Sequence, residues 1–175
     1  IGSQLPVGSV VYKWNGNGYD TEFFETQEVG FPPVTVTNWN PDTATLDVGD
    51  GFWVRTPDGA PATELTLLGE VPNNPTSTIP VAEGLNLVGY AYPVDVTWVD
   101  TELAGKAEVG DTVYIWDGAG YNTVFYETAE IGFPPVTVTN WSDTNVVISV
   151  GQGFWYKRAP GAGTVDWIEV RPYTL

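Results

Sequence analysis

The decapeptide GFPPVTVTNW occurs twice in this chain, at residues 30–39 and at residues 132–141. It is part of a longer internal repeat, because residues 8–55 align without a gap with residues 110–157 and are identical at 27 of 48 positions. A tandem duplication of this length requires the fold to contain the same structural unit twice.

Each copy of the repeat alternates short β-branched and aromatic runs with turns rich in Gly and Pro. In the first copy, residues 11–14 and 21–26 flank the turn sequence NGNGY, which predicts a β-hairpin. Residues 34–37 alternate valine with threonine, the period of a half-buried strand. We therefore predict an all-β fold of two tandem β-sandwich or barrel-like modules, mainly antiparallel.

The second copy is preceded by one further segment, PVAEGLNLVGYAY at residues 80–92, which predicts an opening strand that enters the core. Its counterpart in the first copy would precede Ile1. We therefore predict a first module over residues 1–75 that lacks its opening strand, and a second module over residues 76–175.

The opening strand matters energetically, because burying four or five side chains contributes on the order of 6–15 kcal/mol, about the net stability of a small domain. Three sources could supply the opening strand of the first module: upstream residues removed from a longer tandem array, the chain's own termini, or a strand of a neighbouring subunit. The last is β-strand addition, which generates a filament when it repeats head to tail. The segments outside the repeat are the expected donors, and the predicted interface residues are Ile1, Leu5, Val7, Arg171, Tyr173 and Leu175.

The motifs in their order, G-x-N-L-[VI], then Y-x-W-[DN]-G, then G-x-G-[FY]-W, resemble a known family. They are similar to the β-modules of about 100 residues that occur in tandem in large secreted and cell-surface bacterial proteins. The resemblance covers nearly all of the second copy and the first copy without its opening strand. It implies an extracellular accessory or structural role and supplies no catalytic residues.

The composition excludes several kinds of chemistry. The chain contains no Cys, His or Met, so disulfides, Cys/His zinc sites and His-activated nucleophiles are excluded. A formal net charge of -16 with six Lys and Arg residues makes nucleic acid and anionic membranes poor partners. No apolar run is long enough to span a bilayer, so no membrane insertion is expected. An acidic chain free of sulfur is typical of an extracellular or cell-surface protein.

The aromatic content raises a carbohydrate-binding alternative, since aromatic faces stack on sugar rings. Six of the eight Trp residues occupy equivalent positions of the two copies, which favours core packing for them. The pairs are Trp14/Trp116, Trp39/Trp141 and Trp53/Trp155. The predicted sugar platform therefore consists of the unpaired Trp98 and Trp167, with Tyr19 and Tyr121 at the hairpin tips.

Carboxylates offer two further candidate sites. The sequence E-T-x-E places Glu25 with Glu28, and again Glu127 with Glu130, where a pair could serve acid/base glycoside chemistry. We interpret them as solvated strand-edge charges, because no Arg, His or amide cluster flanks them. Calcium is the one cofactor considered, at Asp42, Asp47 and Asp50. The second copy has Thr144, Ser149 and Gln152 there, so no cofactor is expected.

These observations favour a non-enzymatic extracellular structural protein. The first hypothesis is a self-assembling filament or surface-layer subunit, joined to copies of itself by β-strand addition. The second is a carbohydrate-binding or adhesive accessory module of a larger secreted protein, with a polysaccharide as its partner.

Overall fold

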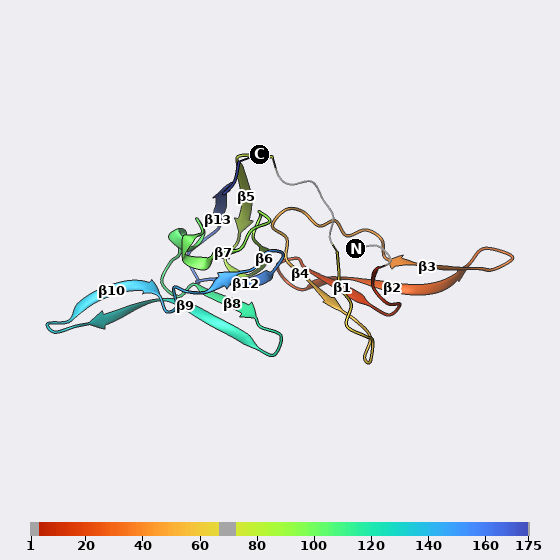
Figure 1. Cartoon of the computed structure of the whole chain (residues 1–175), viewed down its shortest axis with the longest axis horizontal. Helices are drawn as coiled ribbons and strands as arrows, with labels where there is room; N and C mark the ends of the chain where they lie inside the picture. Colours follow the sequence, from red (N-terminus) through yellow and green to blue (C-terminus); the bar gives the residue numbers. More distant parts are fainter. Residues whose placement is uncertain (1–3, 67–72, 175) are drawn as a thin grey trace. The chain divides into compact units, whose positions relative to one another are not determined.

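The computed structural model describes residues 4–66 and 73–174, and it confirms the all-β class with antiparallel sheets (Figure 1). The chain divides into two compact units. Unit 1 comprises Ile1–Asp47 and Phe52–Glu70, and unit 2 comprises Val48–Gly51 and Val71–Leu175. The division after residue 70 lies close to the predicted boundary after residue 75, but four residues of the first repeat belong to unit 2.

Unit 1 contains one antiparallel sheet with the strand order β3-β2-β1-β4. Its strands are β1 (Val10–Trp14), β2 (Tyr19–Val29), β3 (Val34–Asn40) and β4 (Phe52–Arg55). The predicted hairpin is formed by β1 and β2, and the two prolines of the decapeptide separate β2 from β3. Proline lacks the N–H that a ladder needs, so the strand cannot continue through this pair.

Unit 2 repeats this sheet and extends it by one strand, in the order β10-β9-β8-β12-β6. Its strands are β6 (Gly84–Gly89), β8 (Thr112–Trp116), β9 (Tyr121–Ile131), β10 (Val136–Trp141) and β12 (Gly153–Arg158). The sequence repeat is therefore also a structural repeat, since β8, β9 and β10 start at the positions equivalent to β1, β2 and β3.

Two small sheets and two 3₁₀ helices complete unit 2. They are β5 (Thr76–Val81) paired with β13 (Val165–Val170), β7 (Val96–Thr97) paired with β11 (Val147–Ile148), η2 (Trp98–Asp100) and η3 (Ala104–Lys106). The single opening strand predicted over residues 80–92 is wrong, because β5 ends and β6 begins within it. Gly84 has φ 87°, a conformation that other residues rarely adopt, and Asn86 bonds back to both backbone groups of Ala82.

The same side-chain turn closes the first hairpin of each unit. The Asn15 side-chain oxygen accepts the N–H groups two and three residues further on, at 3.1 and 3.0 Å. Asp117 accepts the equivalent two N–H groups at 2.8 Å each. These backbone donors hold the pKa of the Asp117 carboxyl below its ordinary value.

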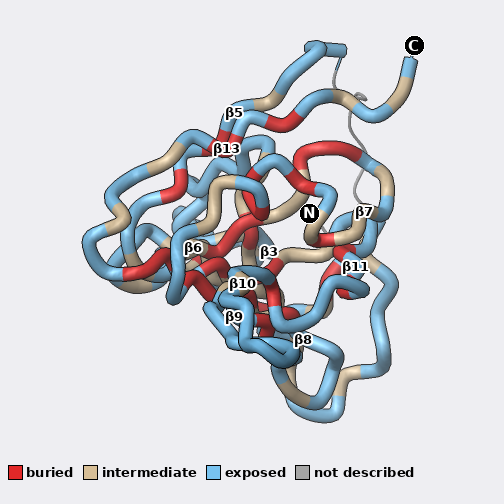
Figure 2. The backbone as a smooth tube through the Cα atoms, turned by 90° about the vertical axis from the view of Figure 1, so that its left-hand side faces the viewer, coloured by how far each residue is buried: buried red, intermediate tan, exposed pale blue. Residues whose placement is uncertain are grey.

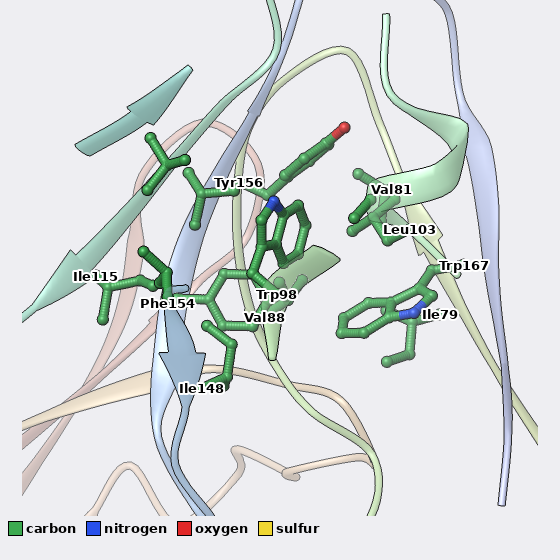
Figure 3. Packing of buried hydrophobic residues seen from close by; sticks show 14 of the residues in the cluster. Ile79, Val81, Val88, Trp98, Leu103, Ile115, Ile148, Phe154, Tyr156 and Trp167 are labelled. Carbon is green, nitrogen blue, oxygen red and sulfur yellow. The ribbon is translucent and has the colours of Figure 1, made fainter. Parts of the chain in front are cut away.

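The main core lies in unit 2 and is built around two fully buried tryptophans (Figure 3). The Trp98 ring packs edge-on against Trp141 and Phe154, at centroid distances of 5.1 and 5.7 Å. Trp167 packs against the same Phe154 at 6.1 Å. Figure 2 marks the buried positions in red along the backbone.

Unit 1 has a thinner core, in which the buried apolar residues described are Leu5, Val10, Val11 and Phe24. Phe154 is 1% exposed, whereas Phe52 at the equivalent position of unit 1 is only half-buried. Trp98 packs edge-on against Phe154, and it lies outside the stretch that the two copies share. The burial of Phe154 thus depends on a ring from outside the repeat.

The four residues Val48–Gly51 belong to unit 2 because they pair with β6. Asp50 lies opposite Val88, and the Gly51 N–H donates to the Leu87 carbonyl oxygen at 3.2 Å. A Cβ added to Gly51 would lie 2.8 Å from the Leu87 Cγ atom, so only glycine fits here. Strand β6 thus has backbone partners on both edges, β12 on one and this segment on the other.

Candidate functional site

The two tryptophans proposed as a sugar platform are core residues, so this part of the prediction is wrong. Trp98 and Trp167 are both 0% exposed (Figure 3). The Trp167 Nε1–H donates to the Glu169 carboxylate at 2.7 Å, inside the protein. Both residues lie outside the stretch over which the two copies align, residues 8–55 and 110–157.

The tyrosines of the same prediction do lie at the surface. Tyr19 is 45% exposed and Tyr121 is 47% exposed, each at the first position of the second hairpin strand. Each ring packs edge-on against a tryptophan, Trp14 at 5.3 Å and Trp116 at 5.1 Å. The structure thus leaves two equivalent aromatic pairs, one in each unit, as the surviving part of the platform.

The N-terminal segment is largely committed to unit 1. Leu5 is 5% exposed and belongs to the unit 1 core. Gln4 exchanges two hydrogen bonds with the backbone of Thr66, at 2.9 and 2.8 Å. Val7 is 52% exposed, and Ile1 lies outside the described residues. The prediction that this segment reaches to another subunit is therefore wrong for Leu5.

The C-terminal segment is held in unit 2 in the same way. The Arg171 backbone N–H donates to the Pro75 carbonyl, and its guanidinium donates to the Asn73 carbonyl at 2.9 Å. The Tyr173 ring packs edge-on against the buried Tyr92 at 5.9 Å. Arg171 and Tyr173 thus pack within unit 2, and their place in a subunit interface stays a prediction, while Leu175 lies outside the described residues.

The candidate carboxylates do not converge. Glu25 and Glu28 are three residues apart on β2, so their side chains point to opposite faces of the strand, as do those of Glu127 and Glu130 on β9. Within residues 4–66 and 73–174, no three acidic side chains gather into a group that could hold a metal ion. The calcium hypothesis for Asp42, Asp47 and Asp50 therefore receives no geometric support.

A buried polar cluster in unit 2 escaped the sequence reasoning. Asp111 is 0% exposed and accepts bonds from the backbone N–H groups of Glu108 and Ala159, from the Tyr156 hydroxyl, and from Arg158 at 3.5 Å. Burial, followed by the bond to Asp111, raises the pKa of Tyr156. Three of the four partners, Tyr156, Arg158 and Ala159, are themselves buried, so we interpret the cluster as part of the stabilising interior of unit 2.

The most exposed features of both units are two long hairpin arms (Figure 1). The first half of β2 pairs with β1, and only its second half pairs with β3. The distal part, residues 25–38, is therefore a two-stranded ribbon, which we call arm 1. Strands β9 and β10 form the equivalent arm 2, residues 127–140. Neither arm contains a buried residue.

The arms end in the Gly-Phe-Pro-Pro turn of the decapeptide, and its phenylalanines point into solvent. Phe31 is 100% exposed and Phe133 is 101% exposed. Thr26 and Thr37 join their hydroxyls across one face of arm 1 at 2.9 Å, and Thr128 and Thr139 do the same in arm 2 at 3.1 Å. The opposite face is apolar toward the tip and carries Val29, Val34 and Val36 in arm 1 and Ala129, Ile131, Val136 and Val138 in arm 2.

The described residues contain no helix with the length and apolar character that crossing a membrane requires. Comparison of the chain with models of protein families, with curated proteins and with solved structures finds no match.

Proposed function

We propose that this chain is a non-enzymatic extracellular structural protein, the subunit of a filament or surface layer whose copies join by β-strand addition. The observation that carries the proposal is the pair of arms, each ending its sheet in an open strand, β3 in unit 1 and β10 in unit 2.

The arms are poorly stabilised as solitary structures. A two-stranded ribbon is marginally stable in water unless a third strand or another element packs against it. Each arm here exposes both faces, an apolar tip and an edge. Contact with another molecule would supply the missing neighbour, and strand addition supplies it through the backbone.

The edges also lack the devices by which soluble proteins prevent edge-to-edge association. Such edges normally carry charges, especially Lys, or a Pro or bulge within the strand. Residues 34–38 and 136–140 both read VTVTN, with no charge and no proline. The pairing of β3 with β2 and of β10 with β9 has a continuous register without a bulge.

The location and the absence of enzymatic activity in this proposal rest on the sequence. The resemblance to tandem modules of secreted and cell-surface bacterial proteins supports an extracellular role. The lack of His and Cys removes the commonest acid/base and nucleophilic groups. With Leu5, Arg171 and Tyr173 packed within their own units, the arms replace the terminal segments as the proposed joints.

The second candidate function is carbohydrate binding, favoured by the two exposed aromatic pairs of Tyr19 with Trp14 and Tyr121 with Trp116. Replacing both tyrosines by alanine would abolish retention on an immobilised polysaccharide without a change in the far-UV circular dichroism spectrum. Undiminished retention would remove this candidate.

The test of the first function is the mass and shape of the purified protein. We expect light scattering at neutral pH to detect particles far above the 19.0 kDa of one chain, and negative-stain electron microscopy to show regular fibres or sheets. A discrete particle of one chain mass over a wide range of concentration and salt would refute self-assembly.

A further inference from the structure

The outward-pointing backbone groups of β10 can be identified from one hydrogen bond at the base of arm 2. The Ser142 N–H donates to the Phe125 carbonyl at 2.8 Å, one position beyond the pair of Trp141 with Tyr126. Inward and outward groups alternate along an edge strand of an antiparallel ladder. The backbone N–H and C=O groups of the even-numbered residues of β10 therefore point toward β9, and those of Thr137 and Thr139 point away from the arm.

Arm 1 has the same geometry. Val34 lies opposite Val29, as Val136 lies opposite Ile131 in arm 2, so the two ladders have the same register. Thr35 and Thr37 therefore also direct their backbone groups outward. Strands β3 and β10 are the terminal strands of their sheets within the described part of the chain.

The ten residues that are identical in the two copies are mostly exposed, whereas several buried positions differ. Val34 and Val136 are each 59% exposed, and the tip phenylalanines are fully exposed. By contrast, the fully buried Asp111 replaces Ser9 of the first copy. Core packing alone would preserve buried positions, so the identity of the two decapeptides points to a requirement at their surface.

Charge identifies the part of the arm that a second copy can approach. The chain carries a formal charge of -16, so two copies repel each other over most of their surfaces. The carboxylates of the arms lie on the inner strands, at Glu25 and Glu28 on β2 and at Glu127 and Glu130 on β9. The outer strands carry none over residues 34–38 and 136–140, so like charges are furthest apart when two copies meet edge to edge.

We infer that the arms of two copies of this chain join edge to edge, with an outer strand of one copy antiparallel to an outer strand of the next. In the register that uses the outward groups, Thr35 of one copy lies opposite Thr37 of the other. The two residues exchange backbone hydrogen bonds, and the reciprocal pair does the same. Val36 then faces its own counterpart across a local two-fold axis. The equivalent residue in arm 2 is Val138. This inference rests on the proposed self-assembly and names its joint.

The absence of cysteine from the chain permits a direct test by disulfide cross-linking. Val36 and its counterpart would form a non-hydrogen-bonded pair with Cα atoms about 4.5 Å apart, within the range of about 4.4–6.8 Å that a disulfide spans. The probe is the double variant Val36→Cys and Val138→Cys, which cross-links whether β3 pairs with β3 or with β10. After mild oxidation we expect a ladder of multimers on non-reducing gels.

The matched control is the double variant Val34→Cys and Val136→Cys, on the same strands and the same face. In the inferred register, two copies of Val34 are four residues apart along the joint, roughly 13 Å at the rise of a strand. This variant should therefore give at most one-tenth of the cross-linked product of the probe.

The outcomes separate the inference from the proposed function. A ladder with the probe and none with the control supports the joint. Fibres that form while the probe cross-links no better than the control overturn the joint and leave self-assembly standing. A protein that shows no particle larger than one chain, and no cross-links, refutes both.

Discussion

The difference in burial between the two units can be tested with one substitution made at two equivalent positions. Phe154 is 1% exposed and contacts Trp98 and Trp167 at centroid distances of 5.7 and 6.1 Å. Replacing a buried phenylalanine by alanine costs about 3–5 kcal/mol of stability. Phe52 occupies the same place in unit 1 but is only half-buried, so Phe52→Ala should cost roughly half as much, about 1.5–2.5 kcal/mol.

Both variants would be unfolded in urea, with tryptophan fluorescence and far-UV circular dichroism followed together. Phe154→Ala should shift the transition to lower urea by about twice as much as Phe52→Ala at an unchanged slope. A net stability of about 5–15 kcal/mol makes a loss of about 4 kcal/mol readily measurable. Equal losses from the two substitutions would refute the reasoning, because they would mean that Trp98 adds nothing to the environment of Phe154.

Four further predictions follow from the arms, the buried cluster and the charge. The double variant Thr37→Pro and Thr139→Pro removes two outward N–H donors per joint, worth about 1–3 kcal/mol, so the critical concentration for assembly measured by sedimentation should rise about 5- to 150-fold. Alanine at the same positions keeps the N–H groups and should leave the critical concentration within about three-fold of the original value. Equal effects of proline and alanine would contradict the joint. Raising NaCl from about 0.1 to 1 M should lower the critical concentration, because the screening length falls from about 10 to 3 Å; a rise would contradict repulsion between copies. Asp111→Ala removes the carboxylate that pairs with the buried Arg158, which keeps its bonds to the Gly163 and Ala162 carbonyls. The loss of this buried counter-charge should cost about 3–5 kcal/mol in urea unfolding, and a loss below 1 kcal/mol would contradict the role of the cluster. Burial and the nearby Glu169 raise the pKa of Tyr90 from 10.0 to about 12. The unfolded chain therefore loses the tyrosine proton at a lower pH than the folded protein does, and the free energy of unfolding should fall as pH rises from 10 to 12. Tyr90→Phe should make this fall shallower, and an unchanged pH profile would assign the fall to other groups.

The sequence predicts the repeated part of the fold well, because local signals determine it. The turn at Asn15, the alternation over residues 34–37 and the prolines at the arm tip specify strands and turns through backbone preferences alone. The single strand expected over residues 80–92 fails because the sequence pattern does not reveal that the chain changes sheet, from β5 paired with β13 to β6 paired with β12. Gly84, with its positive φ, lies at this break, and a glycine inside a strand pattern is compatible with either outcome.

The candidate site is predicted less well, because burial depends on contacts between distant segments. Trp98 and Trp167 lack partners in the repeat, and that observation is compatible with either a surface platform or a core found in one unit. The structure resolves the choice through the 3₁₀ helix at residue 98 and through β13, which place both rings in the core. The buried Asp111 was equally hidden, since its partners Tyr156 and Arg158 are more than forty residues away.

Duplication of the arm determines what kind of assembly the edges can form. A single self-complementary edge pairs once and gives a closed dimer, because the two-fold contact uses the same surface on both copies. Two such edges on one chain leave one unused after each pairing, so a dimer still offers an open edge at both ends and growth continues. The polymer therefore needs the same edge twice, and the described chain has it in β3 and β10, at the ends of their sheets. In the proposed assembly, the decapeptide repeated in full at residues 30–39 and 132–141 would be the connector, and each unit would be the support that holds it in solvent.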